Sequence, residues 1–371
     1  MPIQKYTLSD HTNIFVGNDA NDMFSEFLTN ELPRFSSLYL LTDSNTRHQS
    51  LPLLQSWFGL PQNIVVLEID AGEQHKTLET CRKLWVELAQ NGADRHSLLM
   101  CLGGGVVCDL GGFVASTYQR GMSFLFLPTS LLAQVDASIG GKTGIDLDGL
   151  KNYIGLFSNP LYVFIFPEFL RTLPFEQLLS GFAEVVKQSL IEGRDNWEFV
   201  KSHFPKPDSL CIFSDWQEVI KRSISTKHRI VESDPTEKGL RKVLNFGHTV
   251  AHALETFSLR NDPEPLLHGH AVAMGMLVEL QLSVQLLGFP IKLADEIAKY
   301  LLSFYPLYKF NQNVVDQIIE LMLKDKKNKK LQLKMTLLND LGQPVIDYDC
   351  SLAQVRRFLG IYFNLTSSLA P

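Results

Sequence analysis

Short apolar runs alternate with helical patterns from the start of the chain to about Pro167. Residues 37–44, 63–70, 97–105, 122–130 and 161–167 are rich in Leu, Val, Ile and Phe and read as strands. Between two of them, apolar residues recur at the spacing of one helical face over residues 78–89. Strands separated by helices predict a parallel α/β sheet, whose ligands gather at the carboxyl ends of the strands.

The pattern changes after about Arg171. Residues 174–193, 240–257 and 268–288 each show a long helical pattern, whereas residues 330–348 alternate and carry a turn signal at 339–342 that predicts a small hairpin. The sequence therefore predicts two domains, a parallel α/β domain over residues 1–172 and a mainly α-helical domain over residues 173–371. The active site is expected in the cleft between them.

Length and charge narrow the possible ligands. The 371 residues exceed what one hydrophobic core usually serves, in keeping with two domains. The 34 basic and 40 acidic side chains give a net charge of -6, so the protein as a whole does not attract nucleic acid. An anionic ligand must therefore be held by a local basic cluster.

The sequence predicts a cytoplasmic protein. Its N-terminus lacks the basic segment and apolar run of a signal peptide, and no apolar stretch is expected to reach the roughly 20 residues that span a bilayer. The five cysteines show no paired C-x-x-C spacing, which favours free thiols in a reducing compartment.

A glycine turn follows the strand-like run of residues 97–102. Gly103, Gly104 and Gly105 lead into a helical pattern, so backbone N–H groups can approach a pyrophosphate at the positive end of a helix. Asp43, at the end of an earlier strand, could accept hydrogen bonds from ribose hydroxyls. Such a turn is more often plain architecture, so a dinucleotide site is one of two interpretations.

The segment over residues 127–152 gathers charge among small residues. It contains Asp136, Lys142, Lys151 and Asn152, together with adjacent glycines that allow close backbone approach. Lysines and an amide suit an anionic substrate, although an exposed polar loop is the ordinary interpretation of any one lysine.

Three helical patterns carry possible metal ligands. Glu184 and Lys187 share one face of the first, and Asn245, His248 and His252 are expected on one face of the second. His268 and His270 begin the third. One carboxylate with two imidazoles is a normal catalytic zinc set, whereas a buried ion pair and structural histidines are the alternative.

Six long motifs occur in a fixed order, and the chain resembles the sugar phosphate cyclase family through them. They are GEQHK, GGGVVCDLGGFVASTYQRG, PTSLLAQVDASIGGKTGIDLDGLKN, LPFEQLLSGFAEVVK, GLRKVLNFGHTVAHALE and HGHAVAMGM. The resemblance implies an N-terminal dinucleotide-binding α/β domain joined to a helical metal- and substrate-binding domain. It also implies a homodimer that binds NAD and a divalent metal, zinc or cobalt.

The resemblance assigns roles to residues of this chain. The implied metal ligands are Glu184, His248 and His268. The implied NAD contacts are Asp43, Asn45, Glu73, Lys76, Gly104, Gly105, Val106, Asp109, Thr129 and Ser130. The implied substrate residues are Asp136, Lys142, Lys151, Asn152, Lys187, Lys227, Arg241, Asn245 and His252, with Arg120 reaching a neighbouring subunit and Lys326 or Lys327 contacting phosphate.

The implied chemistry closes a seven-carbon sugar acid phosphate into a carbocycle by transient oxidation, phosphate elimination, reduction and aldol closure. Arg241 and Lys227 suit the substrate carboxylate. Two departures from the family pattern are His270, where Glu is usual, and Ser130, where Thr is common. We expect His270 to lie outside the direct ligands of the metal.

Three alternatives remain open at this stage. One is another sugar phosphate cyclase, acting on a seven-carbon sugar phosphate without a carboxylate or on glucose 6-phosphate. Another is a metal-dependent polyol dehydrogenase, which has no need of the Lys, Arg and Asn array. A third is a binding protein that has lost its chemistry at His270, although every implied ligand remains.

Overall fold

The computed structural model describes residues 6–7, 12–148, 150–309, 314–323 and 332–368. They form two compact units, one of Met1–Gly181 with Phe213–Glu232 and one of Phe182–Ile212 with Ser233–Pro371. Helix α8 (Trp216–Ser233) accounts for the return of the chain to the first unit. The sequence-based division at residue 172 did not include this return, and assigned the residues of α8 to the second domain.

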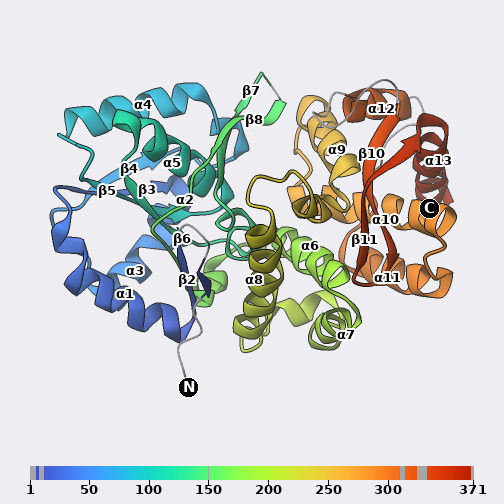
Figure 1. Ribbon diagram of the computed structural model, residues 1–371, viewed down its shortest axis with the longest axis horizontal. Coiled ribbons are helices and arrows are strands. Elements are labelled where there is room, and N and C mark those ends of the chain that lie inside the picture. The colour runs from blue at the N-terminus through green and yellow to red at the C-terminus, as the bar shows by residue number, and fades with distance from the viewer. Residues whose placement is uncertain (1–5, 8–11, 149, 310–313, 324–331, 369–371) are drawn as a thin grey trace. The chain divides into compact units, whose positions relative to one another are not determined.

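A seven-stranded sheet forms the centre of the first unit (Figure 1). Its order is β1 (Tyr6–Thr7), β2 (Asn13–Val16), β9 (Tyr162–Ile165), β6 (Ser123–Pro128), β5 (Leu98–Gly103), β3 (Leu38–Asp43) and β4 (Val65–Ile69). Neighbouring strands are parallel except β1 and β2, which are antiparallel. The predicted parallel α/β sheet is confirmed.

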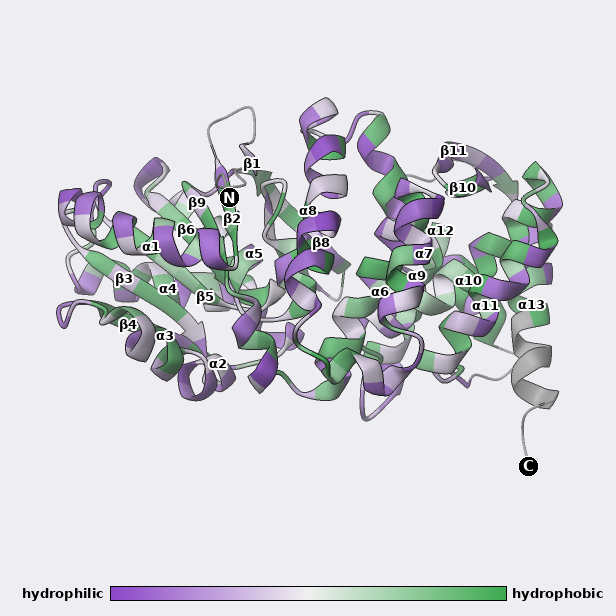
Figure 2. Ribbon diagram, turned by 90° about the horizontal axis from the view of Figure 1, so that it is seen from below, coloured by the Kyte–Doolittle hydropathy of each residue, from purple (hydrophilic) through white to green (hydrophobic). Residues whose placement is uncertain are grey.

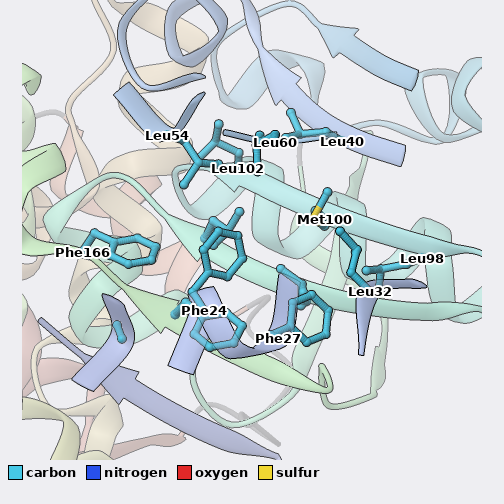
Figure 3. Close-up of a cluster of buried hydrophobic side chains, with 14 of the residues drawn as sticks. Phe24, Phe27, Leu32, Leu40, Leu54, Leu60, Leu98, Met100, Leu102 and Phe166 are labelled. Carbon is cyan, nitrogen blue, oxygen red and sulfur yellow. The ribbon is translucent and has the colours of Figure 1, made fainter. Parts of the chain in front are cut away.

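Helices cover both faces of this sheet, with α1 (Asn18–Asn30) and α3 (Leu51–Phe58) on one face and α4 (Leu78–Gln90) and α5 (Gly105–Thr117) on the other (Figure 1). On the α1 face, Phe24 and Phe27 pack with Leu40, Leu98 and Met100 in a buried cluster (Figure 3). The strands are hydrophobic along much of their length, as burial on both sides requires (Figure 2). This core fixes the carboxyl ends of β3, β5 and β6.

The second unit is mainly helical, as predicted. Its helices include α6 (Phe175–Glu192), α7 (Arg194–His203), α9 (His248–Asn261), α10 (His268–Leu287), α11 (Ile291–Phe304), α12 (Val315–Leu323) and α13 (Leu352–Ser368). β10 (Gln332–Asp340) pairs antiparallel with β11 (Gln343–Ser351), so the predicted hairpin is confirmed.

Helix α10 is long and apolar enough to cross a membrane, alone among the helices of the described residues. The sequence analysis expected no apolar stretch long enough to span a bilayer, and by length and composition that expectation is wrong. However, 61% of its most apolar window is buried inside the protein. Such burial is typical of a core helix.

The helical pattern over residues 240–257 is broken, which corrects the expectation of one continuous helix. Residues 240–245 form a 3-10 segment, η7 (Leu240–Asn245), and α9 begins only at His248. Between them Gly247 has φ 83°, a left-handed conformation that favours glycine. Asn245 therefore lies outside the helix that carries His248 and His252, and does not share their face.

The segment over residues 127–152 is more ordered than an open polar loop. Residues Ala133–Ala137 form a π-helical turn, and β7 (Lys142–Leu147) pairs antiparallel with β8 (Leu150–Phe157). The pairing fixes the register of the two strands, and with it the face of the hairpin on which each polar side chain lies.

Candidate functional site

Glu184, His248 and His268 meet in the second unit. One ligand atom of each lies within 4.8 Å of the others, a spacing that fits one metal ion. Glu184 Oε1 is 3.4 Å from His248 Nε2 and 3.4 Å from His268 Nε2. The structure thus brings together the three residues that the sequence analysis selected as ligands.

Close helix packing brings the two histidines together. His248 is the first residue of α9 and His268 is the first residue of α10. The start of α9 is held against α10 because the Gly247 N–H donates to Glu279 Oε2 at 2.5 Å. Since Gly275 of α10 has no side chain, the backbone of Gly247 can approach it directly.

Glu184 is fully buried in α6, and Lys187 lies against it in a close ion pair. Burial alone would raise the pKa of Glu184, but Lys187 and His268 lower it to about 2. Apart from Lys187 and the two imidazoles, no hydrogen-bond donor to its carboxylate oxygens is found among the described residues. An ionised carboxylate that is poorly satisfied by hydrogen bonds is well suited to a cation.

The second nitrogens of the two histidines have different partners. His248 Nδ1 lies 3.2 Å from the carbonyl oxygen of Phe246. His268 Nδ1 lies 3.3 Å from Glu255 Oε1 of α9. In both rings Nε2 therefore faces Glu184. The sequence analysis missed Glu255, although its place seven residues after His248 puts both on one face of a helix.

The other residues expected near the metal lie around this cluster. The His252 ring packs edge-on against that of His248, with centroids 5.4 Å apart. Asn245 donates through Nδ2 to Glu237 Oε1 at 2.8 Å, and Glu237 was also missed from sequence. The His270 ring contacts Tyr305, with centroids 5.3 Å apart, and is not part of the cluster of metal ligands.

Arg241 is held in a loop shaped by Asp234. The Asp234 carboxylate accepts hydrogen bonds from the backbone N–H groups of Lys238, Gly239 and Arg241. Burial alone would raise the pKa of Asp234, but these three donors lower it. The Arg241 guanidinium is buried and donates through Nη1 to the carbonyl of Pro235 at 2.6 Å. The loop therefore places a permanent positive charge in the interior of the second unit.

The glycine turn in the first unit has the predicted form. β5 ends at Gly103, Gly104 is the N-cap of α5, and Gly105 is the first residue of that helix. A β-carbon on Gly104 would lie 3.2 Å from Ser130 Oγ, so the turn is closely flanked by the segment after β6. Asp43 caps α2 (Ser44–Gln49) by accepting from the backbone N–H of Asn45 at 2.9 Å.

Lys76 joins residues that were expected at the cofactor and at the substrate. It is buried, donates to Asp109 Oδ2 at 2.5 Å and also donates to Asn152 Oδ1. Burial alone would lower the pKa of Lys76, but Asp109 and Glu73 raise it. Lys76 is therefore a buried cation that ties the start of α5 to the β7–β8 hairpin.

The conformation of Asn152 depends on a further carboxylate, Asp146. Asn152 has φ 50°, in the left-handed region, and its N–H donates to Asp146 Oδ1 at 2.7 Å. Asp146 lies in the same charged segment as Lys151 and Asn152 but was not selected from sequence. Lys151 Nζ lies 3.5 Å from Glu73 Oε1.

Lys227 and Asp136 form a further ion pair in the first unit. Lys227 Nζ donates to Asp136 Oδ1 at 2.6 Å and to the Asp136 carbonyl at 2.7 Å. Lys142 and Arg120 are exposed, and Arg120 has φ 69°. Val106 and Thr129 flank the glycine turn, where the Thr129 N–H donates to the Gly103 carbonyl at 2.9 Å. Lys326 and Lys327 lie outside the described residues.

The glycine turn of the first unit and the Glu–His–His cluster of the second are typical of metal-dependent enzymes that also bind a dinucleotide. Residues 66–180 match the 3-dehydroquinate synthase N-terminal family and residues 181–328 match the C-terminal family. The chain belongs to the 3-dehydroquinate synthase family. The resemblance stated from its motifs is thereby confirmed, as is the expectation of an enzyme.

Similar proteins support this assignment. The chain is 38% identical over 349 residues to 3-dehydroquinate synthase of Parabacteroides distasonis, covering 94% of this chain and 97% of that relative. A 2-deoxy-scyllo-inosose synthase complexed with carbaglucose-6-phosphate, NAD+ and Co2+ has a similar fold, with TM-score 0.81, 24% identity and coverage of 96% and 99%. So does the 2-epi-5-epi-valiolone synthase of Streptomyces hygroscopicus with NAD+ and Zn2+ bound, with TM-score 0.79, 21% identity and coverage of 98% and 99%. At these identities the two structures bear on the fold alone.

Proposed function

We propose that the chain catalyses the 3-dehydroquinate synthase reaction, in which 3-deoxy-arabino-heptulosonate 7-phosphate is converted to 3-dehydroquinate and phosphate. The observation that carries the proposal is the meeting of Glu184, His248 and His268 in a chain of this family. The relative from Parabacteroides distasonis bears the name of this activity.

The ligand set fits a divalent metal such as zinc or cobalt. It offers one anionic oxygen and two imidazole nitrogens and leaves coordination positions for substrate. The Glu184 carboxylate is fully buried, so a cation held between it and the two imidazoles would offset the cost of its desolvation. When bound, NAD supplies a reversible hydride acceptor and the metal supplies a Lewis acid for a substrate oxygen.

Residues of the first unit bind the cofactor. Gly104 and Gly105 present backbone N–H groups of α5 to the pyrophosphate, flanked by Val106, Thr129 and Ser130. Asp43 ends β3 and Asn45 lies in the first turn of α2 directly after it, where ribose hydroxyls are bound in such sheets. Burial raises the pKa of Asp109 and Lys76 opposes that shift, and Lys76 also holds Asn152 for the substrate.

Charged residues bind the substrate. Arg241 and Lys227 bind the carboxylate, Arg241 because its planar fork matches two oxygens, and Asp136 holds Lys227 through an ion pair. Lys187, beside Glu184, stabilises negative charge on the substrate oxygen. The phosphate is bound by the remaining implied residues, which are Lys142, Lys151, Asn152, Asn245 and His252.

The protein is further proposed to be a cytoplasmic homodimer, in which Arg120 reaches the partner's site. Arg120 is exposed in the 3-10 turn Tyr118–Arg120 that directly follows α5, and this exposure supports the role. Four of the five cysteines are buried as free thiols, which favours a reducing compartment. Equilibrium sedimentation of the wild type and of Arg120→Ala, with activity assayed across protein concentration, tests the subunit arrangement.

The test of the reaction is incubation with 3-deoxy-arabino-heptulosonate 7-phosphate, NAD and zinc. Phosphate and 3-dehydroquinate should appear in equal amounts with no net NADH, and a Glu184→Gln variant serves as the metal-site control. Sedoheptulose 7-phosphate and glucose 6-phosphate should not react, since neither offers a carboxylate to Arg241. Phosphate release from one of these sugars instead, or steady NADH formation from glycerol, would overturn the proposal.

A further inference from the structure

Glu255 lies next to the metal cluster without belonging to it. It is on α9, 3% exposed, and its Oε1 atom is 3.3 Å from Nδ1 of His268. A carboxylate so deeply buried is costly unless a donor or cation compensates it. The His268 ring supplies such a donor, because its other nitrogen, Nε2, faces Glu184.

The Nδ1 atoms of the two histidines in the cluster contact different kinds of acceptor. His248 directs Nδ1 to a neutral backbone carbonyl, that of Phe246, whereas His268 directs Nδ1 to a carboxylate. A carbonyl fixes the orientation of a ring, but a carboxylate also withdraws positive charge from the N–H and makes the opposite nitrogen a stronger donor. The difference is therefore one of charge as well as of geometry.

Both histidines lie where a bound cation would be disfavoured, so the negative charge of Glu255 would help the site to hold a metal. Each is the first residue of its helix, where the helix dipole places partial positive charge and disfavours a cation. Within the cluster, Glu184 is the single anionic ligand. A second carboxylate behind His268 offsets the dipoles without occupying a coordination position.

We propose that Glu255 is a positioning residue for the metal, which accepts the Nδ1 proton of His268 in a hydrogen bond, keeps Nε2 directed at the ion and strengthens its binding. The inference rests on the proposed metal-dependent function. It assigns a role in metal affinity to a residue that would make no contact with the metal or the substrate.

Two variants separate orientation from charge. Glu255→Gln keeps the size of the side chain and a carbonyl oxygen that can accept from Nδ1, so it removes the charge alone. Glu255→Ala removes both. Zinc dissociation constants, measured by competition with a chromophoric chelator, should rise by about 10-fold in Glu255→Gln and by up to about 100-fold in Glu255→Ala. Glu296→Gln, which removes a surface carboxylate paired with Lys201 in the same unit, should leave the constant unchanged.

A measurement on the wild type keeps the inference testable if a variant folds poorly. In zinc-loaded protein labelled with 15N-histidine, His268 should carry its proton on Nδ1, with a downfield proton resonance, and bind zinc through Nε2. Coordination through Nδ1, or zinc affinity in both variants within twofold of the wild type, would refute the role of Glu255 while leaving the metal site standing. Absence of zinc binding by the wild type would overturn the metal-dependent function together with the inference.

Discussion

The backbone of Gly275 lies directly against that of Gly247, so that a β-carbon on Gly275 would come within 1.8 Å of the Gly247 carbonyl oxygen. Gly247 immediately precedes His248, and Gly275 lies two turns into the helix that begins with His268. The absence of two side chains therefore allows the starts of α9 and α10, and with them the two proposed metal ligands His248 and His268, to lie close together.

Gly275→Ala is expected to destabilise the protein and to weaken metal binding. The added methyl group must displace the backbone of Gly247, and overpacking of this kind costs about 1–3 kcal/mol. Denaturant unfolding and zinc titration measure the two effects. Gly360→Ala is the matched control, because nothing lies within 4 Å of its β-carbon position in α13. If zinc affinity of Gly275→Ala equals that of the control, the glycine contact does not position the ligands.

His268 and His270 are expected to respond differently to substitution. His268→Ala should lose stoichiometric zinc, since a three-ligand site would retain two ligands. His270→Ala and His270→Glu should both retain it, because His270 packs on Tyr305 instead of facing Glu184. Metal content after dialysis, measured by elemental analysis, decides between them. Zinc lost from His270→Ala but kept in His268→Ala would show that the ligand was assigned to the wrong histidine.

Metal affinity is expected to increase with pH. Burial alone would lower the pKa of His268, but Glu255 and Glu184 raise it to about 10 in the metal-free protein. At neutral pH a metal must therefore displace a proton, and zinc affinity should rise about tenfold per pH unit between roughly pH 6.5 and 8.5. Calorimetry in buffers of different ionisation enthalpy should show release of about one proton. Affinity that is independent of pH in this range would contradict the prediction.

The same shift acts on the metal-free fold in the opposite sense. Because the folded pKa of His268 lies above its unfolded value, the stabilisation is fully present below about pH 6.5. It is lost as the pH rises through about 10. Unfolding of metal-free His268→Asn should lack this component of the pH dependence.

Arg241→Ala is expected to weaken substrate binding by roughly 1.5–3 kcal/mol, the range for a hydrogen bond to a charged group, with little effect on NAD affinity. Asp234→Asn should shift the substrate KM in the same direction by less, because three backbone donors lose their charged acceptor. Steady-state kinetics and NAD fluorescence titration separate the two ligands. A loss of NAD affinity at unchanged substrate KM would remove Arg241 from its proposed role.

The spacing of apolar residues was sufficient to predict helices with one buried face and strands that are buried on both faces. The strand before Gly103 and the helix over residues 78–89 were predicted because their own side chains record which surfaces are buried. The pattern over residues 240–257 misled, since a single left-handed glycine, Gly247, interrupts a helix without changing the spacing of the apolar residues around it. Asn245 was consequently placed on the wrong face.

The three proposed metal ligands were selected from sequence through the family resemblance, because the helical patterns alone also allowed a buried ion pair and structural histidines. The residues that contact these ligands and the neighbouring substrate residues could not be predicted from sequence. Glu255 contacts His268 across 13 positions and Asp146 holds the backbone of Asn152 six residues away. Neither pairing has a short-range signature, and the return of α8 to the first unit likewise depends on tertiary packing alone.

The three proposed metal ligands lie on three separate helices, at positions 184, 248 and 268, so the site exists only when those helices are assembled. An unfolded chain offers the ion no comparable set of donors. Zinc bound at this site would therefore be linked thermodynamically to folding, and free metal at a thousandfold excess over its dissociation constant would add about 4 kcal/mol to the stability of the second unit. Scarcity of metal in a cell would then reduce the amount of folded enzyme as well as its turnover.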